Sequence, residues 1–346
     1  MQRSTLALLI VAQTLAGCGD DEPSAHGDGG RGDGGSQDAG VRPDMDASTS
    51  PPSGLDAGAV PDGAVNDAAL SPADAGPKMQ PVTIRFAGRV GTAEFACGTR
   101  YPNQGSTAAT ITPVDFRFFV QDLKLLTPSG EEVPVAIDRR DPWQAEGVAL
   151  IDLENSTGSC LATPGTNREI TGRVPEGSYV GIRFANGVPE SLNHGELTAL
   201  PPVLQSPGMQ WSWLLGFRFV KAEVQQVLEG RADAGAPAGT DAGADAAVRM
   251  VPGFALVHTG AVGCSGNVSL GNVQCSKPNR NAVRLDGFNP DRNVIAVDLG
   301  ALFGASDLTK DEQCHSGAES CAPMARLGID DDTGLPLADQ KVYRVE

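Results

Sequence analysis

The sequence predicts an all-β fold, an antiparallel β-sandwich or barrel with long loops, in residues 81–346. Apolar residues there alternate with a period of two, as in Val82–Phe86 and Phe116–Val120, and this is the pattern of strands with one buried face. Gly, Pro, Asn and Asp separate the runs, as at Thr127–Gly130, and such residues favour turns between antiparallel strands. These two observations favour sheets over helices.

The other alternating runs extend the same pattern along the chain, and no long amphipathic helix interrupts them. Two segments, Leu299–Phe303 and Pro323–Gly328, are expected as short helical turns. The additional predicted strands are Val180–Phe184, Phe217–Phe219, Phe254–Leu256 and Val283–Leu285. Many short strands separated by turn residues indicate a sandwich or barrel.

The N-terminus has the pattern of an export signal. A basic residue, Arg3, precedes a short apolar run, Leu6–Val11. The tetrapeptide Leu15–Cys18 follows and resembles a bacterial lipobox, in which the cysteine is lipidated. The run is shorter than the roughly 20 apolar residues that span a bilayer. Residues 1–17 are therefore predicted to be a lipoprotein signal peptide, and Cys18 the lipidated first residue of the mature chain. With Gly19 after it, the anchor favours the outer membrane, on its periplasmic face or the cell surface.

Acidic residues are concentrated behind this anchor. The chain has 26 Lys and Arg and 43 Asp and Glu, a net charge of −17, which argues against a nucleic-acid partner. Residues 19–80 hold 12 of the acids and 3 of the bases and no aromatic residue. Residues 18–80 are therefore predicted to be a lipidated, disordered tether, since they have little apolar surface to bury. Residues 231–247 share its composition and are expected to be a low-complexity insertion.

Six cysteines remain after Cys18, an even number that fits an oxidising compartment. The short spacings favour the disulfides Cys264–Cys275 and Cys314–Cys321, which leaves Cys97 and Cys160 as a long-range pair. A zinc or iron–sulfur site is the competing interpretation, but no CxxC pair is present. We therefore expect structural disulfides, although 15 connectivities are possible for six cysteines.

Motifs for catalysis are absent from the sequence. It contains no Walker loop, no HExxH and no GxSxG, and no carboxylate pair stands out from the general acidity. We therefore expect a protein that is not an enzyme. An oxidase that uses copper is the alternative within the enzyme class.

Three histidines fall in the predicted β-domain: His194, His258 and His315. His258 is in phase with Phe254 and Leu256, so on a strand it shares their buried face. A buried imidazole needs a hydrogen-bond partner or a metal, and the sequence leaves both possibilities open.

A sulfur-containing and aromatic strand follows the first of these histidines. Met209, Trp211 and Trp213 alternate and therefore share one face. Such a set can be core or an aromatic wall. It also suits copper(I), which prefers soft sulfur and imidazole ligands.

Several separate blocks, in the same order, resemble the MbnP-like proteins, the four-Cys proteins of metallo-mystery pair systems. The resemblance runs from about Val82 to Val345. Its blocks are Phe95–Gly98, Asp115–Val120, Trp143-Gln144, Val148–Asp152, Gly187–Pro189, Asn193-His194, Met209–Trp213, Gly216–Phe219, His258–Gly260, Gly263-Cys264, Cys275–Arg280 and the loop between Cys314 and Cys321.

The resemblance implies an extracytoplasmic β-protein that binds one copper ion. It also implies a di-haem c-type partner of the MauG/peroxidase type, which oxidises a tryptophan to kynurenine. Kynurenine has an aromatic amine and a ketone, whose lone pairs indole lacks. Trp211 and Trp213 are the candidates for this change, with Trp143 third.

The copper ligands expected from this resemblance are His194, His258 and the kynurenine, with Met209 and His315 as alternates. His315 stands where relatives tend to carry Met after the third motif cysteine. A surface adhesion protein or ligand-binding β-sandwich lipoprotein without a metal is the alternative function. In that case the disulfides and tryptophans serve structure alone.

Overall fold

The computed structural model describes residues 76–346 except 213, 228–252 and 317–320. The chain divides into two units, Met1–Asp67 and Ala68–Glu346, and the first lies outside the described residues. The predicted signal peptide, Cys18, most of the tether, Trp213 and the 231–247 insertion also lie outside them. Of the described residues, none belongs to a helix with the length and hydropathy needed to cross a bilayer.

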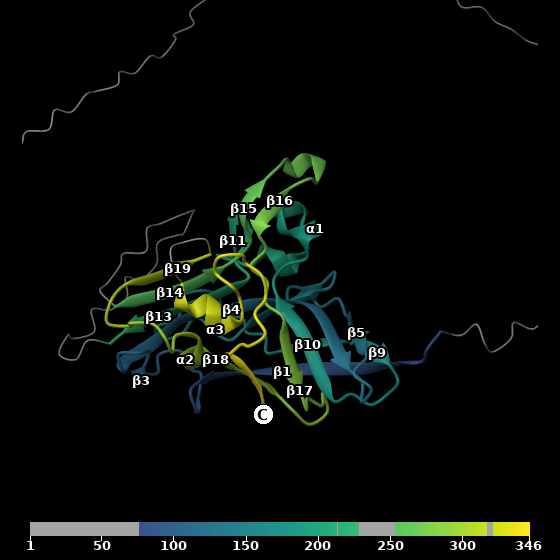
Figure 1. Cartoon of the computed structure of the whole chain (residues 1–346), viewed down its shortest axis with the longest axis horizontal. Coiled ribbons are helices and arrows are strands. Elements are labelled where there is room, and N and C mark those ends of the chain that lie inside the picture. Colours follow the sequence, from purple (N-terminus) through teal and green to yellow (C-terminus); the bar gives the residue numbers. More distant parts are fainter. Residues whose placement is uncertain (1–75, 213, 228–252, 317–320) are drawn as a thin grey trace, which may run out of the picture. The chain divides into compact units, whose positions relative to one another are not determined.

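One sheet has six strands, and β1 lies inside it (Figure 1). Strand β1 pairs with β18 in parallel and with β9 in antiparallel orientation. The strands in order are β20 (Tyr343–Val345), β18 (Ile295–Asp298), β1 (Met79–Val90), β9 (Glu169–Pro175) and β6 (Ala136–Ile137), and β2 (Ala93–Glu94) pairs with β1.

The second sheet has ten strands and is organised around the long strand β4. Strands β10 and β13 pair with one edge of β4, and β3, β5 and β8 pair with its other edge. Strand β7 pairs with β8. Along the main path the strands are β17 (Val283–Asp286), β10 (Gly181–Asn186), β4 (Ala109–Leu126), β13 (Val220–Gln226), β14 (Phe254–Thr259) and β19 (Glu312–His315). The others are β3 (Tyr101–Gln104), β5 (Glu132–Pro134), β7 (Gln144–Ala145) and β8 (Val148–Asp152).

Short elements complete the fold beside the sheets. Two hairpins, β11–β12 and β15–β16, form separate two-stranded sheets. Their strands are β11 (Gln210–Ser212), β12 (Gly216–Phe217), β15 (Val262–Ser265) and β16 (Gln274–Lys277). The helices are α1 (Glu190–Asn193), η2 (Leu197–Ala199), η3 (Pro202–Gln205), η4 (Val268–Leu270), α2 (Leu299–Leu302) and α3 (Ala322–Leu327).

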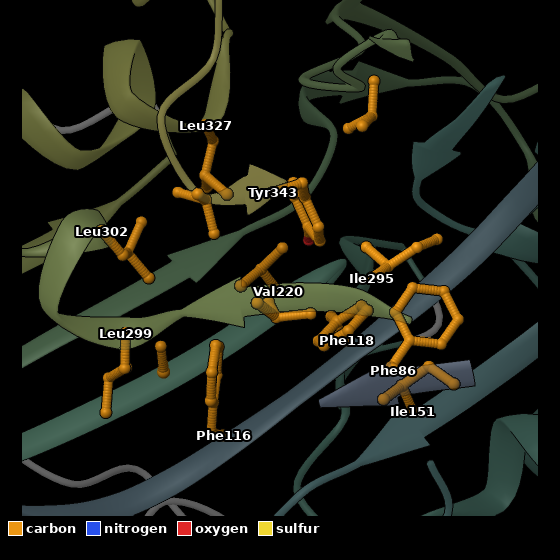
Figure 2. Packing of buried hydrophobic residues seen from close by; sticks show 14 of the residues in the cluster. Phe86, Phe116, Phe118, Ile151, Val220, Ile295, Leu299, Leu302, Leu327 and Tyr343 are labelled. Carbon is orange, nitrogen blue, oxygen red and sulfur yellow. The ribbon is translucent and has the colours of Figure 1, made fainter. Parts of the chain in front are cut away.

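The two large sheets share one hydrophobic cluster, so they pack as a sandwich. Figure 2 shows Phe116, Phe118 and Val220 from the ten-stranded sheet with Phe86 and Ile295 from the six-stranded sheet. The rings of Phe86 and Phe118 meet edge to face, with centroids 5.8 Å apart. This arrangement suits the ring quadrupoles, and each fully buried Phe contributes roughly 1.5–3 kcal/mol.

The middle of β4 is buried on both faces. Phe116 and Phe118 belong to the cluster between the sheets, whereas Phe119 belongs to a second cluster on the other face. This second cluster is covered by η3 and the β11–β12 hairpin through Leu204 and Phe217. The ten-stranded sheet therefore has a second covered face, and the candidate functional residues lie on that face.

The all-β prediction is confirmed, and the sandwich is the architecture observed. In the described residues neither large sheet closes into a barrel. The sheets are mixed, because β1 pairs with β18 and β14 pairs with β19 in parallel. The expected helical turns are present as α2 and α3. Strand β1 begins at Met79, so the predicted boundary at residue 81 falls inside it.

The three expected disulfides are confirmed. Cys97–Cys160 links the loop after β2 to the loop after β8, and Cys264–Cys275 joins β15 to β16. Cys314–Cys321 links β19 to the residue before α3. The chain is thus cross-linked once over a long separation and twice locally.

Replacing Cys97 and Cys160 together by Ser opens a link between residues 63 apart, and replacing Cys264 and Cys275 opens one between residues 11 apart. Loop-closure entropy predicts a loss of about 4 kcal/mol in unfolding free energy for the first pair and about 3 kcal/mol for the second. Denaturant unfolding of both double variants measures this. A larger loss from the shorter loop would contradict the entropic explanation.

Asp152, at the end of β8, is fully buried beside Arg117, and burial raises its pKa to about 8. The unfolded chain releases this proton near pH 4, so the folded protein binds the extra proton between about pH 4 and 8. The free energy of unfolding should therefore fall as pH rises through this window, by at most about 1.4 kcal/mol per unit from this group. Asp152→Asn should remove that slope.

The measurement for Asp152 is denaturant unfolding between pH 5 and 8. The variant of the exposed Asp291, Asp291→Asn, is the control and should keep the slope of the unmodified chain. An unchanged slope in Asp152→Asn would show that the buried carboxyl is already ionised at pH 5.

Candidate metal centre

His258 lies on β14 and is buried, with 6% of its surface exposed. Its neighbours in phase, Phe254 and Leu256, are also buried, as the alternation predicts. They form a small cluster separate from the one between the sheets, which takes the intervening Ala255 and Val257. The side chain of His258 therefore lies on the second covered face of the ten-stranded sheet, away from the six-stranded sheet.

A carboxylate sets the orientation of this imidazole. His258 Nε2 lies 2.7 Å from Oε1 of Glu223 on the neighbouring strand β13. Burial raises the pKa of Glu223, but the hydrogen bond from His258 and the charge of Lys221 outweigh it and hold the pKa below its usual value. The ionised carboxylate can only accept, so Nε2 donates its proton and Nδ1 carries the lone pair.

The Nδ1 atom of His258 is buried and has no hydrogen-bond partner in the described structure. Burial lowers the pKa of His258, so the ring is neutral at neutral pH, although Glu223 opposes the shift. A neutral imidazole whose second nitrogen is held by a carboxylate is the usual form of a metal-binding histidine. The geometry therefore fits a metal ligand at Nδ1.

Behind Glu223 runs a chain of paired charges. Lys221 Nζ lies 3.3 Å from Glu223 and 2.6 Å from Oδ2 of Asp115. Arg117 then donates twice to Asp115, at 2.9 and 2.7 Å. Burial raises the pKa of Asp115, but Lys221 and Arg117 reverse this and keep the carboxyl ionised. Each buried charge is thus compensated by its neighbour.

His315 lies directly beside His258. Strand β19 pairs in parallel with β14 so that the two histidines are register partners, and their ring centroids are 5.2 Å apart at 71°. Partial burial and the charge of Arg218 lower the pKa of His315, which favours the neutral ring. The structure therefore brings together two neutral imidazoles predicted as ligands.

Trp211 packs against Gly260, just beyond the strand that carries His258. A Cβ atom at Gly260 would meet ring atoms Cζ3 and Cη2 of Trp211, so the benzene half of the indole packs on the glycine backbone. Gly260 follows β14 two residues after His258. The guanidinium of Arg218 lies over the same indole, 5.3 Å from its centroid. We call His258, Glu223, His315, Trp211 and Arg218 the His258 cluster.

The other predicted ligands have no described contact with His258. Met209 is fully buried in the second hydrophobic cluster, and its carbonyl accepts from the backbone N–H of Arg218 at 2.8 Å. His194 follows α1, and its Nε2 lies 3.2 Å from Sγ of Cys275 and 3.0 Å from the Asn193 amide. Their place in one site with His258 stays a prediction, as does that of Trp213.

Two groups of Cys, His and Glu in the described part of the chain are compact enough to hold a metal ion. One is His194 with Cys264 and Cys275, and the other is Cys97, Glu154 and Cys160. In the second group the Glu154 oxygens already accept from the backbone N–H groups of Ser156 and Thr163. That carboxylate supports a loop, which leaves the His194 group and the His258 cluster as candidates.

Sequence reasoning missed Glu223, Lys221 and Arg218. In the sequence Val220–Gln226, polar residues alternate with Val and Ala, which is typical of a strand with one face in solvent. Glu223 and Lys221 are two residues apart and so share one face of their strand. This pair of opposite charges, close to a strand that carries a buried His, is the signal that could have identified Glu223. Its partner His258 lies 35 residues further along the chain, and alternation within one strand does not reveal this contact.

Comparisons with known proteins agree with this fold. The family model described as MbnP matches residues 79–316. The solved structure of MbnP from Methylosinus trichosporium is similar with a TM-score of 0.62 and 30% sequence identity, over 78% of this chain and 98% of that one. No curated protein matches. The match covers more than half of the chain and every residue of the His258 cluster, and the chain therefore belongs to the MbnP family.

Proposed function

We propose that this chain is a copper-binding protein of the cell envelope and that Trp211, converted to kynurenine, completes its site. The observation that supports it most is the buried His258 Nδ1, which carries a lone pair and no partner, beside a second neutral histidine. Imidazole nitrogen suits copper, and family membership favours a copper-related role.

The residues of the His258 cluster would have different roles in binding the ion. His258 and His315 would hold the ion through imidazole nitrogens, and Glu223 fixes the His258 tautomer. Kynurenine at 211 would add amine or ketone lone pairs near them. Because kynurenine keeps the benzene ring of tryptophan, its packing against Gly260 supports either form. Bound copper would supply redox chemistry and, as copper(I), a preference for soft ligands.

The proposal includes how the protein reaches its working state. A di-haem c-type protein of the MauG/peroxidase type would carry out the oxidation in trans, as the family resemblance implies. Cys18 would anchor the mature chain to the outer membrane through its lipid, with residues 18–80 as a tether. The protein would sequester or hand on copper and would not itself be an enzyme.

Protein produced together with such a partner should carry kynurenine at Trp211 and bind one copper ion. Peptide mass spectrometry and metal analysis test this, with Trp143→Phe as the control that leaves both results unchanged. An unmodified mass at Trp211 and Trp213, with no copper bound, would instead support the metal-free adhesion or ligand-binding function.

Replacing His258 by Ala should weaken copper binding at least tenfold, because it removes the ligand nitrogen that is best oriented. Competition titration with a copper chelator measures the affinity, and circular dichroism checks the fold. An affinity equal to that of the unmodified protein would exclude His258 from the site.

Glu223→Ala should weaken copper binding by about 10- to 100-fold, as expected when the hydrogen-bond partner of a ligating His is removed. Glu223→Gln should change it far less, because the amide oxygen can still accept from Nε2. The same competition titration distinguishes the two variants. Equal losses would show that the charge of Glu223, and not its hydrogen bond, matters.

A further inference from the structure

We propose that His194, Cys264 and Cys275 form a second metal site, which becomes available when the Cys264–Cys275 disulfide is reduced. It would take a thiophilic ion with a filled d shell, such as Zn²⁺ or Cu⁺. The ligand atoms of the three residues all lie within 4.8 Å of one another. Two thiolates and one imidazole are a donor set that proteins use for such ions, with a fourth position left open.

The orientation of His194 follows from its neighbour Asn193. The Asn193 Oδ1 atom accepts a hydrogen bond from the backbone N–H of Phe217, at 3.2 Å. The amide nitrogen is therefore the end that lies 3.0 Å from His194 Nε2, and an amide NH₂ group only donates. Nε2 then carries the lone pair of the imidazole.

The same nitrogen also lies beside a sulfur atom that has no proton to give. His194 Nε2 lies 3.2 Å from Sγ of Cys275, which is in the disulfide. Neither atom can donate, so the contact is not a hydrogen bond in the oxidised protein. Only 5% of the His194 side chain is exposed, and its Nδ1 is buried without a partner. In the oxidised protein Nε2 accepts from the Asn193 amide, and a carboxylate oxygen of Glu190 lies 3.9 Å away. A cation bound to Nε2 and the sulfurs would replace the amide hydrogen bond and lie near this carboxylate.

The backbone keeps the two sulfurs together without the disulfide. Cys264 and Cys275 are register partners in the β15–β16 hairpin, with Cα atoms 3.8 Å apart. Two further register pairs, Val262 with Lys277 and Ser265 with Gln274, flank them. The thiols therefore stay adjacent after reduction, and the site needs little rearrangement.

This disulfide is also the one most open to a reductant. Both of its cysteines are partly exposed, whereas Cys97–Cys160 and Cys314–Cys321 each include a buried cysteine. A dithiol would attack one sulfur through a mixed disulfide and then close its own ring. Two electrons and two protons pass to Cys264 and Cys275, and the dithiol becomes a disulfide. Metal binding then releases the two thiol protons.

Cobalt(II) is the probe, because thiolate ligation gives it a charge-transfer absorption. The full chain is reduced briefly with a dithiol, desalted without oxygen and titrated with Co²⁺, and alkylation with mass spectrometry identifies the opened cysteines. We expect Cys264 and Cys275 to open first and one Co²⁺ to bind with the thiolate band. The oxidised chain should show no band.

His194→Ala keeps the disulfide and should weaken Co²⁺ binding to the reduced chain at least tenfold. His258→Ala should bind Co²⁺ with the same band and affinity as the unmodified chain, which separates this site from the proposed copper centre. The Cys97→Ser/Cys160→Ser variant should also keep the band. No band after Cys264 and Cys275 have opened, or an affinity unaffected by His194→Ala, would overturn the proposal.

Discussion

The bidentate ion pair between Arg117 and Asp115 is the interaction on which the candidate copper centre depends. Both side chains are almost fully buried, on a strand whose two faces are covered. Burying either charge alone would cost several kcal/mol, so each needs the other. Asp115 has a second partner in Lys221, and Lys221 in turn reaches Glu223. Glu223, the last charged member of this series, accepts a hydrogen bond from the neutral imidazole of His258.

This chain of charges explains why a carboxylate can remain ionised beside His258 in a buried place. Arg117 and Lys221 carry two positive charges, and Asp115 and Glu223 two negative ones, so the set is neutral. A neutral His258 therefore completes it without an added charge. The same balance leaves Nδ1 as the lone-pair atom, which links the electrostatics of the sheet to its capacity to bind a cation.

Local patterns predicted the parts of the fold that have local causes. Alternation identified Phe116–Val120 and Phe254–Leu256 as strands, and short spacing identified the pairs Cys264–Cys275 and Cys314–Cys321. The parallel pairing of β1 with β18 was not predicted, because it joins segments far apart in sequence and leaves no periodic signal in either.

In the candidate site, too, local features were predicted from the sequence and contacts between distant segments were not. The phase of His258 predicted its burial, and the burial is confirmed. That His315 lies beside it depends on the register of β14 and β19, and that Glu223 reaches it depends on the pairing of β13 with β14. Neither can be read from one segment, since both arise when distant segments pack. Resemblance to a family grouped His258 with Trp211 and, as an alternate ligand, with His315, and periodicity could not do this.

The parallel pairing of β14 with β19 has a consequence for the order of events in the life of the protein. Ser316 hydrogen-bonds to the His258 carbonyl across 58 residues of sequence, so this contact needs a long loop to close. Closing a loop of this length costs conformational entropy, which is repaid only by the packing of the sheet. The two imidazoles therefore meet only once β14 and β19 have paired. The proposed oxidation of Trp211 beside these imidazoles would therefore act on a folded surface, and not on a nascent chain.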